Sequence, residues 1–255
     1  MNKTELKSFL EVKYNYYNNP KWIKDDPISI PHRFSKKQDI EISGFLASII
    51  AWGNRKSILN NAERMLQIME YDPHNFILHH QKSDLKRCKD FVHRTFNEHD
   101  LAYFFMALQR LYHSHESMDA LFHKLISGNG FTQNTLSDFK AYFFEVQHQY
   151  QRKKHLSDPR KNSAAKRLNM FLRWMVRKDN IGVDMGIWTS INPSELSCPL
   201  DVHSGKVARK LGLLKRKQND AKAVNELDTA LRKLDAQDPV KYDFALFGLG
   251  VYEKF

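Results

Sequence analysis

The stretch that decides the fold spans residues 163–212 and reads SAAKRLNMFLRWMVRKDNIGVDMGIWTSINPSELSCPLDVHSGKVARKLG. Its first part, Ser163–Arg177, carries apolar residues at the three- and four-residue spacing of one helix face. Its last part, His203–Leu211, has helical spacing too and follows Asp201, a residue type that favours a helix N-cap. Gly212 stands where this second helix is expected to stop. The stretch therefore predicts two helices joined by an irregular segment.

The same periodicity dominates the rest of the 255-residue chain. Ile40–Ile50 is apolar on most sides, which predicts a central core helix. Asp238-Pro239 has an acidic N-cap and a proline at the first helical position. Long alternating β-branched strands are absent, so we predict an all-α fold. Further helices are expected at Glu5–Tyr17, Lys56–Met69, Leu101–Tyr112, Met118–Ser127, Leu136–Tyr150, Ala221–Leu234 and Pro239–Tyr252.

The length allows one large domain or two tightly joined lobes around a substantial core. We expect a single compact unit, residues 1–255, that contains two helical lobes. Residues 40–162 form a barrel-like lobe, and residues 1–39 together with 163–255 form the second lobe. The charged stretch Arg152–Lys161 is the candidate crossover between them.

Basic residues exceed acidic ones, 40 against 29, which gives a formal net charge of +11. Gln151–Lys178 holds ten Lys or Arg and a single acid, and Val202–Asn219 holds six and no acid. Such clusters favour a polyanionic partner through counterion release, which predicts a nucleic-acid-binding face. Solvated helix faces produce the same pattern, so charge alone leaves both interpretations open.

Several classes of protein are disfavoured by composition. The two cysteines, Cys88 and Cys198, are too few for a disulfide scaffold or a four-cysteine metal site. The amino-terminal residues lack the apolar core of a signal peptide, and no apolar run approaches the length of a membrane span. P-loop, nucleophile-elbow and dinucleotide-binding glycine patterns are absent. We therefore expect a cytoplasmic protein.

Lys166 and Asp201 are the two residues of the quoted stretch that can carry chemistry. At 100° per residue, Lys166 projects away from the apolar helix face, beside Arg173 and Trp174. A lysine flanked by cations and a large aromatic ring inside a cleft can act as a nucleophile. From spacing alone, an exposed lysine on a basic helix is the simpler interpretation. Asp201 can stabilise a developing positive charge, although capping is the simpler role on local grounds.

The segments KRLNMFLRWM (166–175) and PLDVHSGKVARKLG (199–212) resemble the core of helix-hairpin-helix DNA glycosylases. More narrowly, they resemble the archaeal 8-oxoguanine DNA glycosylases. The stretches ISGFLASIIAWGNRKSILNNAERM (42–65) and DPVKYDFALFGLG (238–250) are similar to the first and last core helices of that superfamily. The whole chain is also similar to an uncharacterised conserved bacterial family, a domain of unknown function sharing the PHRF, VDMGIW and PLDVH blocks.

The resemblance implies a two-lobed helical bundle of the glycosylase type, with an active-site cleft between the lobes. It implies a monomeric, nucleoid-associated DNA N-glycosylase/AP lyase that acts on oxidised bases, such as 8-oxoguanine, in damaged double-stranded DNA. Lys166 matches the nucleophilic lysine and Asp201 the catalytic aspartate. Residues implied to contact DNA are Asn54, Arg55, Arg173, Arg177, His203, Lys206 and Arg209, and weaker candidates for the base pocket are Asp184, Trp188 and Asp243.

The chain departs from the superfamily pattern in two places. The glycine-rich hairpin is replaced by SDPRKNSAAKR (157–167), which puts in doubt its phosphate contacts and its bound monovalent cation. The carboxy-terminal cysteines that hold an iron–sulfur cluster in some members are missing, so no such cluster is expected. The alternative function is therefore a non-catalytic nucleic-acid-binding protein on a glycosylase-like scaffold. The enzyme hypothesis requires the Lys166 amine and the Asp201 carboxylate to converge.

Overall fold

The computed structural model describes residues 1–126, 128, 130–149 and 151–255. The chain folds into two compact units. Unit 1 comprises Met1–Ile23, Gly128–Ser137 and Ser157–Phe255, and unit 2 comprises Lys24–Ser127 and Asp138–Leu156. These bounds differ from the expected lobes, because residues 24–39 belong to unit 2 and residues 128–137 and 157–162 belong to unit 1.

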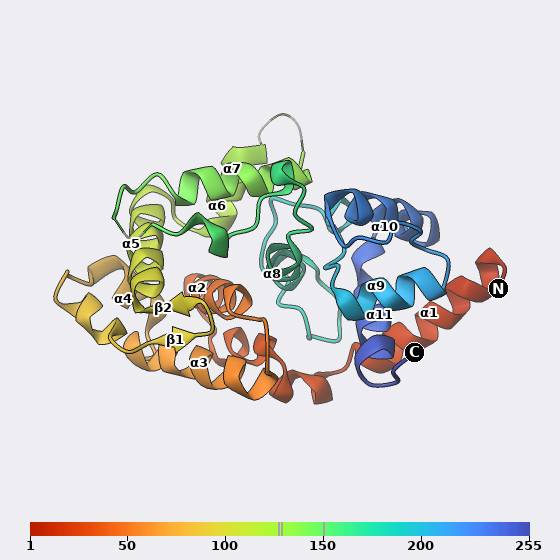
Figure 1. Ribbon diagram of the computed structural model, residues 1–255, viewed down its shortest axis with the longest axis horizontal. Coiled ribbons are helices and arrows are strands. Elements are labelled where there is room, and N and C mark those ends of the chain that lie inside the picture. Colours follow the sequence, from red (N-terminus) through yellow and green to blue (C-terminus); the bar gives the residue numbers. More distant parts are fainter. Residues whose placement is uncertain (127, 129, 150) are drawn as a thin grey trace. The chain divides into compact units, whose positions relative to one another are not determined.

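The fold is mostly helical, as predicted (Figure 1). In chain order, the α-helices are α1 (Lys3–Tyr17), α2 (Lys37–Ile49), α3 (Arg55–Ile68), α4 (Pro73–His79), α5 (Glu98–Ser114), α6 (Met118–Ile126), α7 (Gln133–Phe143), α8 (Lys166–Val176), α9 (Val202–Lys210), α10 (Ala221–Leu234) and α11 (Tyr242–Val251). The 3₁₀ helices are η1 (Pro20–Asp25), η2 (Pro27–Ser29), η3 (Pro31–Arg33), η4 (Asp84–Cys88), η5 (Lys153–His155), η6 (Pro159–Lys161), η7 (Pro193–Glu195) and η8 (Pro239–Lys241).

Differences from the predicted elements are local. Helix α4 and a short antiparallel hairpin, β1 (Val92–His93) with β2 (Phe96–Asn97), were not expected. Both are too short to produce a periodic pattern in the sequence. The predicted helix ends at Ser127 and Tyr150 lie outside the described residues, and α7 already ends at Phe143.

Unit 2 is built around α2, as predicted for a helix that is apolar on most sides. All of its residues from Asp39 to Ile49 are buried. The ring centre of Phe45 lies 6.0 Å from the ring centre of Phe104 and 5.5 Å from that of Phe143. Residues 24–39 join this unit because η2 and η3 pack against α2.

Glu41 is the polar exception inside α2. Its carboxylate accepts hydrogen bonds from the Tyr112 hydroxyl at 2.8 Å and from the backbone amide of Met118 at 2.9 Å. Burial raises the pKa of Glu41, and these donors act in the opposite direction. The buried carboxylate satisfies a backbone amide at the start of α6, so its role is structural.

Unit 1 is built around α11, which packs against α1 and α9 (Figure 1). Two glycines permit this close packing. A Cβ atom at Gly248 would lie 2.3 Å from the ring of Tyr17 in α1, and one at Gly250 would lie 3.0 Å from backbone atoms of His203 in α9. The start of α9, which carries Asp201, is thereby seated on α11.

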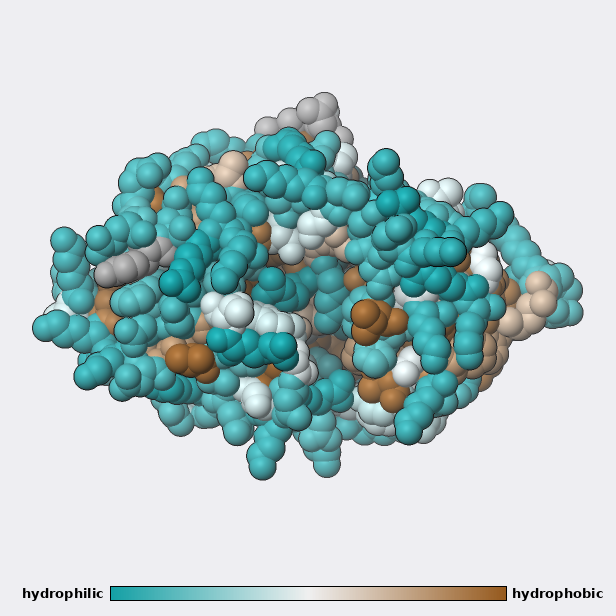
Figure 2. Space-filling view, in the orientation of Figure 1, coloured by the Kyte–Doolittle hydropathy of each residue, from teal (hydrophilic) through white to brown (hydrophobic). Residues whose placement is uncertain are grey.

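The face of the molecule drawn in Figure 2 is mostly hydrophilic. Within the described ranges, no helix combines the length and the apolar character that a membrane crossing requires.

Candidate active site

Lys166 is the first residue of α8, and the chain enters this helix through an unusual backbone. Asn162 and Ala165 both adopt left-handed conformations, with φ of 64° and 46°. The Ser163 hydroxyl accepts a hydrogen bond from the Ala165 amide at 3.2 Å. The same segment is tied to the start of α10, because the Asn162 side chain donates to the Asp220 carboxylate at 3.1 Å. These contacts fix the position of Lys166 without a glycine-rich hairpin.

Four carbonyl oxygens of this segment accept hydrogen bonds from other groups of the chain. Those of Asp158 and Pro159 accept amides of the following turn, that of Asn162 accepts the Ala221 amide, and that of Ala164 accepts the Asn169 side chain. A monovalent cation at a hairpin needs carbonyl oxygens directed toward it. The four carbonyl groups named above are directed toward donors within the chain.

Asp201 is the N-cap of α9, as its position in the sequence predicted. Its carboxylate accepts the backbone amides of His203 at 2.8 Å and Ser204 at 3.0 Å. In return, the Ser204 hydroxyl accepts the Asp201 amide at 2.9 Å, which completes a capping box. Both hydrogen bonds from α9 reach Oδ1 of the carboxylate, which leaves Oδ2 for another contact.

The structure brings Lys166 and Asp201 together. The Lys166 Nζ atom lies 4.0 Å from Asp201 Oδ2, and the side chains are 26% and 20% exposed. The same amine lies 3.6 Å from the sulfur of Met170, one turn further along α8. A cation and a carboxylate from distant parts of the sequence thus meet where solvent, or a ligand, can reach both.

Asp243 in α11 is a buried carboxyl group linked to this pair. Burial raises its pKa to about 6, the charge of Asp201 acts in the same direction, and those of Arg173 and Lys166 oppose it. One carboxyl oxygen accepts a hydrogen bond from the Arg173 guanidinium, and the other lies 3.9 Å from the Cys198 sulfur. The candidate site therefore has a buried acid behind its exposed lysine and aspartate.

A buried ion-pair network continues from Asp243 along α8. Arg173 pairs with Asp184, with Nε and Oδ1 3.2 Å apart. Arg177 pairs with the other oxygen of Asp184 at 3.2 Å and with Asp238 at 2.9 Å. Burial is the largest influence on the pKa of Arg177 and lowers it, but the charges of Asp184 and Asp238 raise it overall.

Arg177 also binds Tyr14 and Asp179, which were not among the site residues predicted from the sequence. It donates to the Tyr14 hydroxyl at 2.6 Å and to Asp179 Oδ2 at 2.7 Å. Although burial raises the pKa of Asp179, hydrogen bonds from Asn18, Ile181 and Arg177 lower it to about 2. The position of Asp179 two residues after Arg177 was a signal in the sequence for this partner, whereas Tyr14 is 163 residues away and left none.

Arg173 and Arg177, which were expected to hold DNA phosphates, lie in the interior of unit 1. Arg173 is 9% exposed and Arg177 is 1% exposed, and both guanidiniums are paired with carboxylates. Buried charges require such partners. Asp238 is the N-cap residue of η8 and Pro239 opens that helix, as predicted, but the Asp238 side chain accepts from Arg177 and makes no capping hydrogen bond.

Two of the base-pocket candidates are buried as well. Asp184 lies between the two arginines described above, and burial raises its pKa. The Trp188 indole packs edge-on against Phe171, with ring centres 5.5 Å apart. Asp184 thus compensates the charge of the two arginines, and Trp188 packs in the interior. Asp243 alone keeps an electrostatic link to the candidate site.

The remaining predicted DNA contacts lie at accessible positions. His203 and Lys206 are exposed on α9, and Arg209 is partly exposed but donates to the carbonyl of Arg216 at 2.7 Å. Asn54 and Arg55 belong to unit 2, where Asn54 is the N-cap of α3.

Asp228 in α10 holds the segment that leads to Asp201. It is buried and accepts the Cys198 backbone amide at 2.9 Å, and burial raises its pKa to about 6. Because the folded pKa is above the unfolded value of about 3.9, the protonated form favours folding, and this stabilisation is lost as the pH rises through 6.

The variant Asp228→Asn lacks this titrating group. We therefore expect the difference in unfolding free energy between the native protein and Asp228→Asn to fall by about 3 kcal/mol between about pH 3.5 and pH 7. Urea denaturation of both proteins across this range measures the difference. Parallel pH profiles would show that Asp228 titrates normally.

A family model described as a protein of unknown function, DUF2400, matches residues 26–252. The matched range includes every residue of the candidate site. Comparisons with curated proteins and with solved structures found no match.

Proposed function

We propose an activity from the arrangement of this chain's own side chains, because the chain belongs to the DUF2400 family of proteins of unknown function. It is a DNA glycosylase with lyase activity that removes an oxidised base, 8-oxoguanine being the first candidate, from double-stranded DNA. Lys166 is the nucleophile and Asp201 assists it. A fold of the helix-hairpin-helix glycosylase type is part of this proposal.

One observation carries the proposal, namely the 4.0 Å separation between the Lys166 amine and the Asp201 carboxylate. The resemblance to glycosylases, which rests on the sequence alone, implies roles for the same two residues. The Lys166 and Asp201 side chains are partly exposed, whereas those of Arg173 and Arg177 are buried. Lysine amines form covalent imines with sugar aldehydes, and a nearby carboxylate favours the positive charge that develops on the sugar.

The proposed reaction begins with the damaged nucleotide turned out of the duplex, which costs a few kcal/mol of stacking and pairing energy. The unprotonated Lys166 amine forms a bond to C1′ of the sugar. The bond between C1′ and the base nitrogen breaks, and the base leaves with the electron pair and takes up a proton. Asp201 Oδ2 accepts the proton that the amine releases.

The C1′–O4′ bond of the covalent intermediate then breaks, O4′ takes up the proton held by Asp201, and the nitrogen electron pair forms a protonated imine between Lys166 and C1′. Loss of a proton from C2′ expels the 3′ phosphate by β-elimination, which cuts the strand. Water hydrolyses the imine and restores the lysine. No redox partner is required in this sequence.

Exposed groups near the pair are suited to hold the DNA backbone. His203 and Lys206 follow Asp201 on α9 and are exposed. Arg209 is partly exposed, and we assign it a secondary role because its guanidinium already binds carbonyl groups of its own chain. Asn54 and Arg55 remain proposed contacts on unit 2.

A second candidate is a DNA-binding protein that has lost catalysis. The observation that favours it is the segment before Lys166, SDPRKNSAAKR (157–167), which has no glycine-rich hairpin to bind DNA phosphates. A covalent assay separates the two candidates.

The test is borohydride trapping on duplexes that carry 8-oxoguanine, an abasic site or no lesion. Reduction of the imine should yield a stable complex on a damaged duplex with the native protein and none with Lys166→Gln. The matched control is Lys222→Gln, because Lys222 is an exposed lysine in the first turn of another helix of unit 1. It should trap as the native protein does.

Absence of trapping and cleavage on every duplex, together with tight duplex binding, would favour the non-catalytic candidate. Equal trapping by Lys166→Gln would refute Lys166 as the nucleophile.

Binding to undamaged duplex should weaken steeply between about 50 and 200 mM salt, because phosphate contacts release counterions. We expect Lys206→Ala to reduce the slope of log affinity against log salt by about 1. Fluorescence anisotropy at several salt concentrations measures the slope. A slope equal to that of the native protein would remove Lys206 from the proposed DNA surface.

A further inference from the structure

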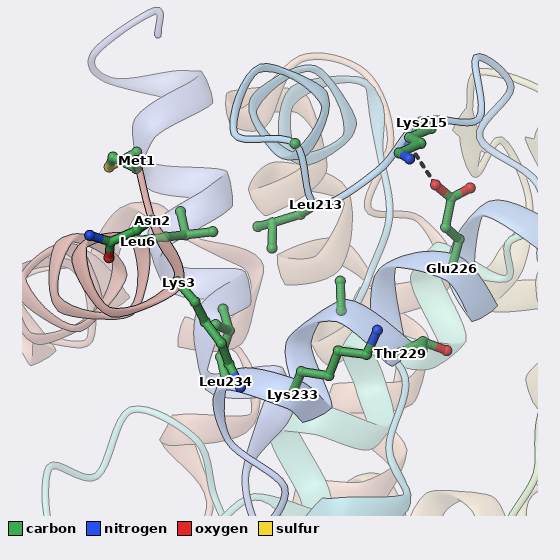
Figure 3. A pocket seen from close by; sticks show the side chains of 12 residues that line it. Met1, Asn2, Lys3, Leu6, Leu213, Lys215, Glu226, Thr229, Lys233 and Leu234 are labelled. Carbon is green, nitrogen blue, oxygen red and sulfur yellow. Dashed lines mark hydrogen bonds between the residues drawn. The ribbon is translucent and has the colours of Figure 1, made fainter.

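Unit 1 contains a groove of about 410 Å³ away from the residues of the candidate active site (Figure 3). It is formed by the start of α1, the turn after α9 and one face of α10. Its volume falls within the range of about 300–1,000 Å³ that is usual for ligand sites. No residue of the proposed lyase chemistry lines it.

The inner surface of the groove is apolar. Leu213 and Leu234 are buried members of the hydrophobic core of unit 1, and Leu6 and Ala230 pack against them while remaining partly exposed. Figure 3 shows Leu6, Leu213 and Leu234 around the open space. A phosphate chain gains nothing from such a surface, whereas aliphatic side chains do.

The rim of the groove is positively charged. Lys3, Lys215 and Lys233 line it and are exposed, and no described ion pair neutralises their ammonium groups. The one acid in the lining, Glu226, accepts the backbone amides of Lys215 at 2.6 Å and Arg216 at 3.3 Å. Its carboxylate is therefore committed to holding the turn after α9.

We propose that this groove binds an acidic amphipathic helix of a partner protein. Apolar side chains on one face of that helix enter between α1 and α10, and its Asp and Glu residues pair with the lysines of the rim. Helices that lay an apolar face into a groove are a recurring mode of recognition. Charge complementarity at the rim increases the rate of association and favours an acidic partner over other partners. The proposal stands independently of the lyase activity.

The probe is a fluorescein-labelled 18-residue peptide with leucines at helix positions i, i+3, i+4 and i+7 and glutamates on the other faces. We expect saturable binding to the full chain by fluorescence anisotropy. The double variant Lys3→Glu/Lys233→Glu should weaken the affinity at least about 10-fold. The matched control is Lys222→Glu, a charge reversal on α10 outside the groove, which should change it less than about 2-fold.

Three outcomes would overturn the proposal. The first is no binding, or equal binding of a peptide of the same composition with leucines scattered around the helix. The second is a pair of results, namely that undamaged duplex displaces the peptide and that the double variant loses duplex affinity to the same extent as peptide affinity. The lysines would then bind DNA. The third is binding of laurate but not of the peptide, which would indicate a small amphiphile. Borohydride trapping by the double variant should stay unchanged, which keeps this test separate from that of the lyase.

Discussion

Replacing Arg177 by methionine is expected to lower the unfolding free energy by about 3–5 kcal/mol. The guanidinium is almost fully buried and neutralises Asp184, Asp238 and Asp179 at distances of 2.7–3.2 Å. Methionine fills a similar volume but removes the countercharge of the partly exposed Asp179 and Asp238, and it leaves the buried Asp184 with Arg173 as its remaining cation. Urea denaturation at neutral pH measures the loss.

Arg87→Met is the matched control for this prediction. Arg87 also pairs with two acids, Glu70 and Asp84, but its side chain is 44% exposed. Exposed pairs of this kind contribute about 0–1 kcal/mol. If the two variants lose similar amounts of stability, the network around Arg177 does not hold unit 1 together in the way described.

Asp201→Asn is expected to reduce base removal about 100- to 1,000-fold while leaving the fold intact. Asparagine caps helices about as well as aspartate, so the hydrogen bonds to His203 and Ser204 are retained. The negative charge 4.0 Å from the Lys166 amine is lost. Single-turnover cleavage of a duplex containing 8-oxoguanine measures the rate, and denaturation measures stability.

The two readouts separate capping from catalysis. A rate close to that of the native protein, with unchanged stability, would show that Asp201 acts only as the cap of α9. A large loss of stability would show that its charge is needed for folding.

The helical class and most helix positions were predictable because they follow from local periodicity and capping. The core position of α2 and the N-cap role of Asp201 needed no information from elsewhere in the chain. The hairpin of β1 and β2 and the seven-residue α4 were missed because such short elements bury too few residues to leave a pattern. The unit bounds differ from the expected lobes because tertiary packing, which local periodicity does not show, places residues 24–39 with α2 and residues 128–137 and 157–162 in unit 1.

The candidate site was predictable only in part. Periodicity could not show that Lys166 and Asp201 meet, and their pairing came from the resemblance to glycosylases. Arg173 and Arg177 were predicted to contact DNA because the sequence shows the charge of a helix face but not the residues that pack against it. Their partners Asp238 and Asp243 lie more than 60 residues further along the chain. Only tertiary structure reveals that these charges are neutralised internally.

The most direct test is to locate the covalent bond itself. The native protein is trapped with borohydride on a duplex containing an abasic site, digested with a protease, and its peptides are sequenced by mass spectrometry. We predict that the reduced sugar is attached to Lys166. Attachment to the amino terminus or to another lysine, or no adduct at all, would contradict the account.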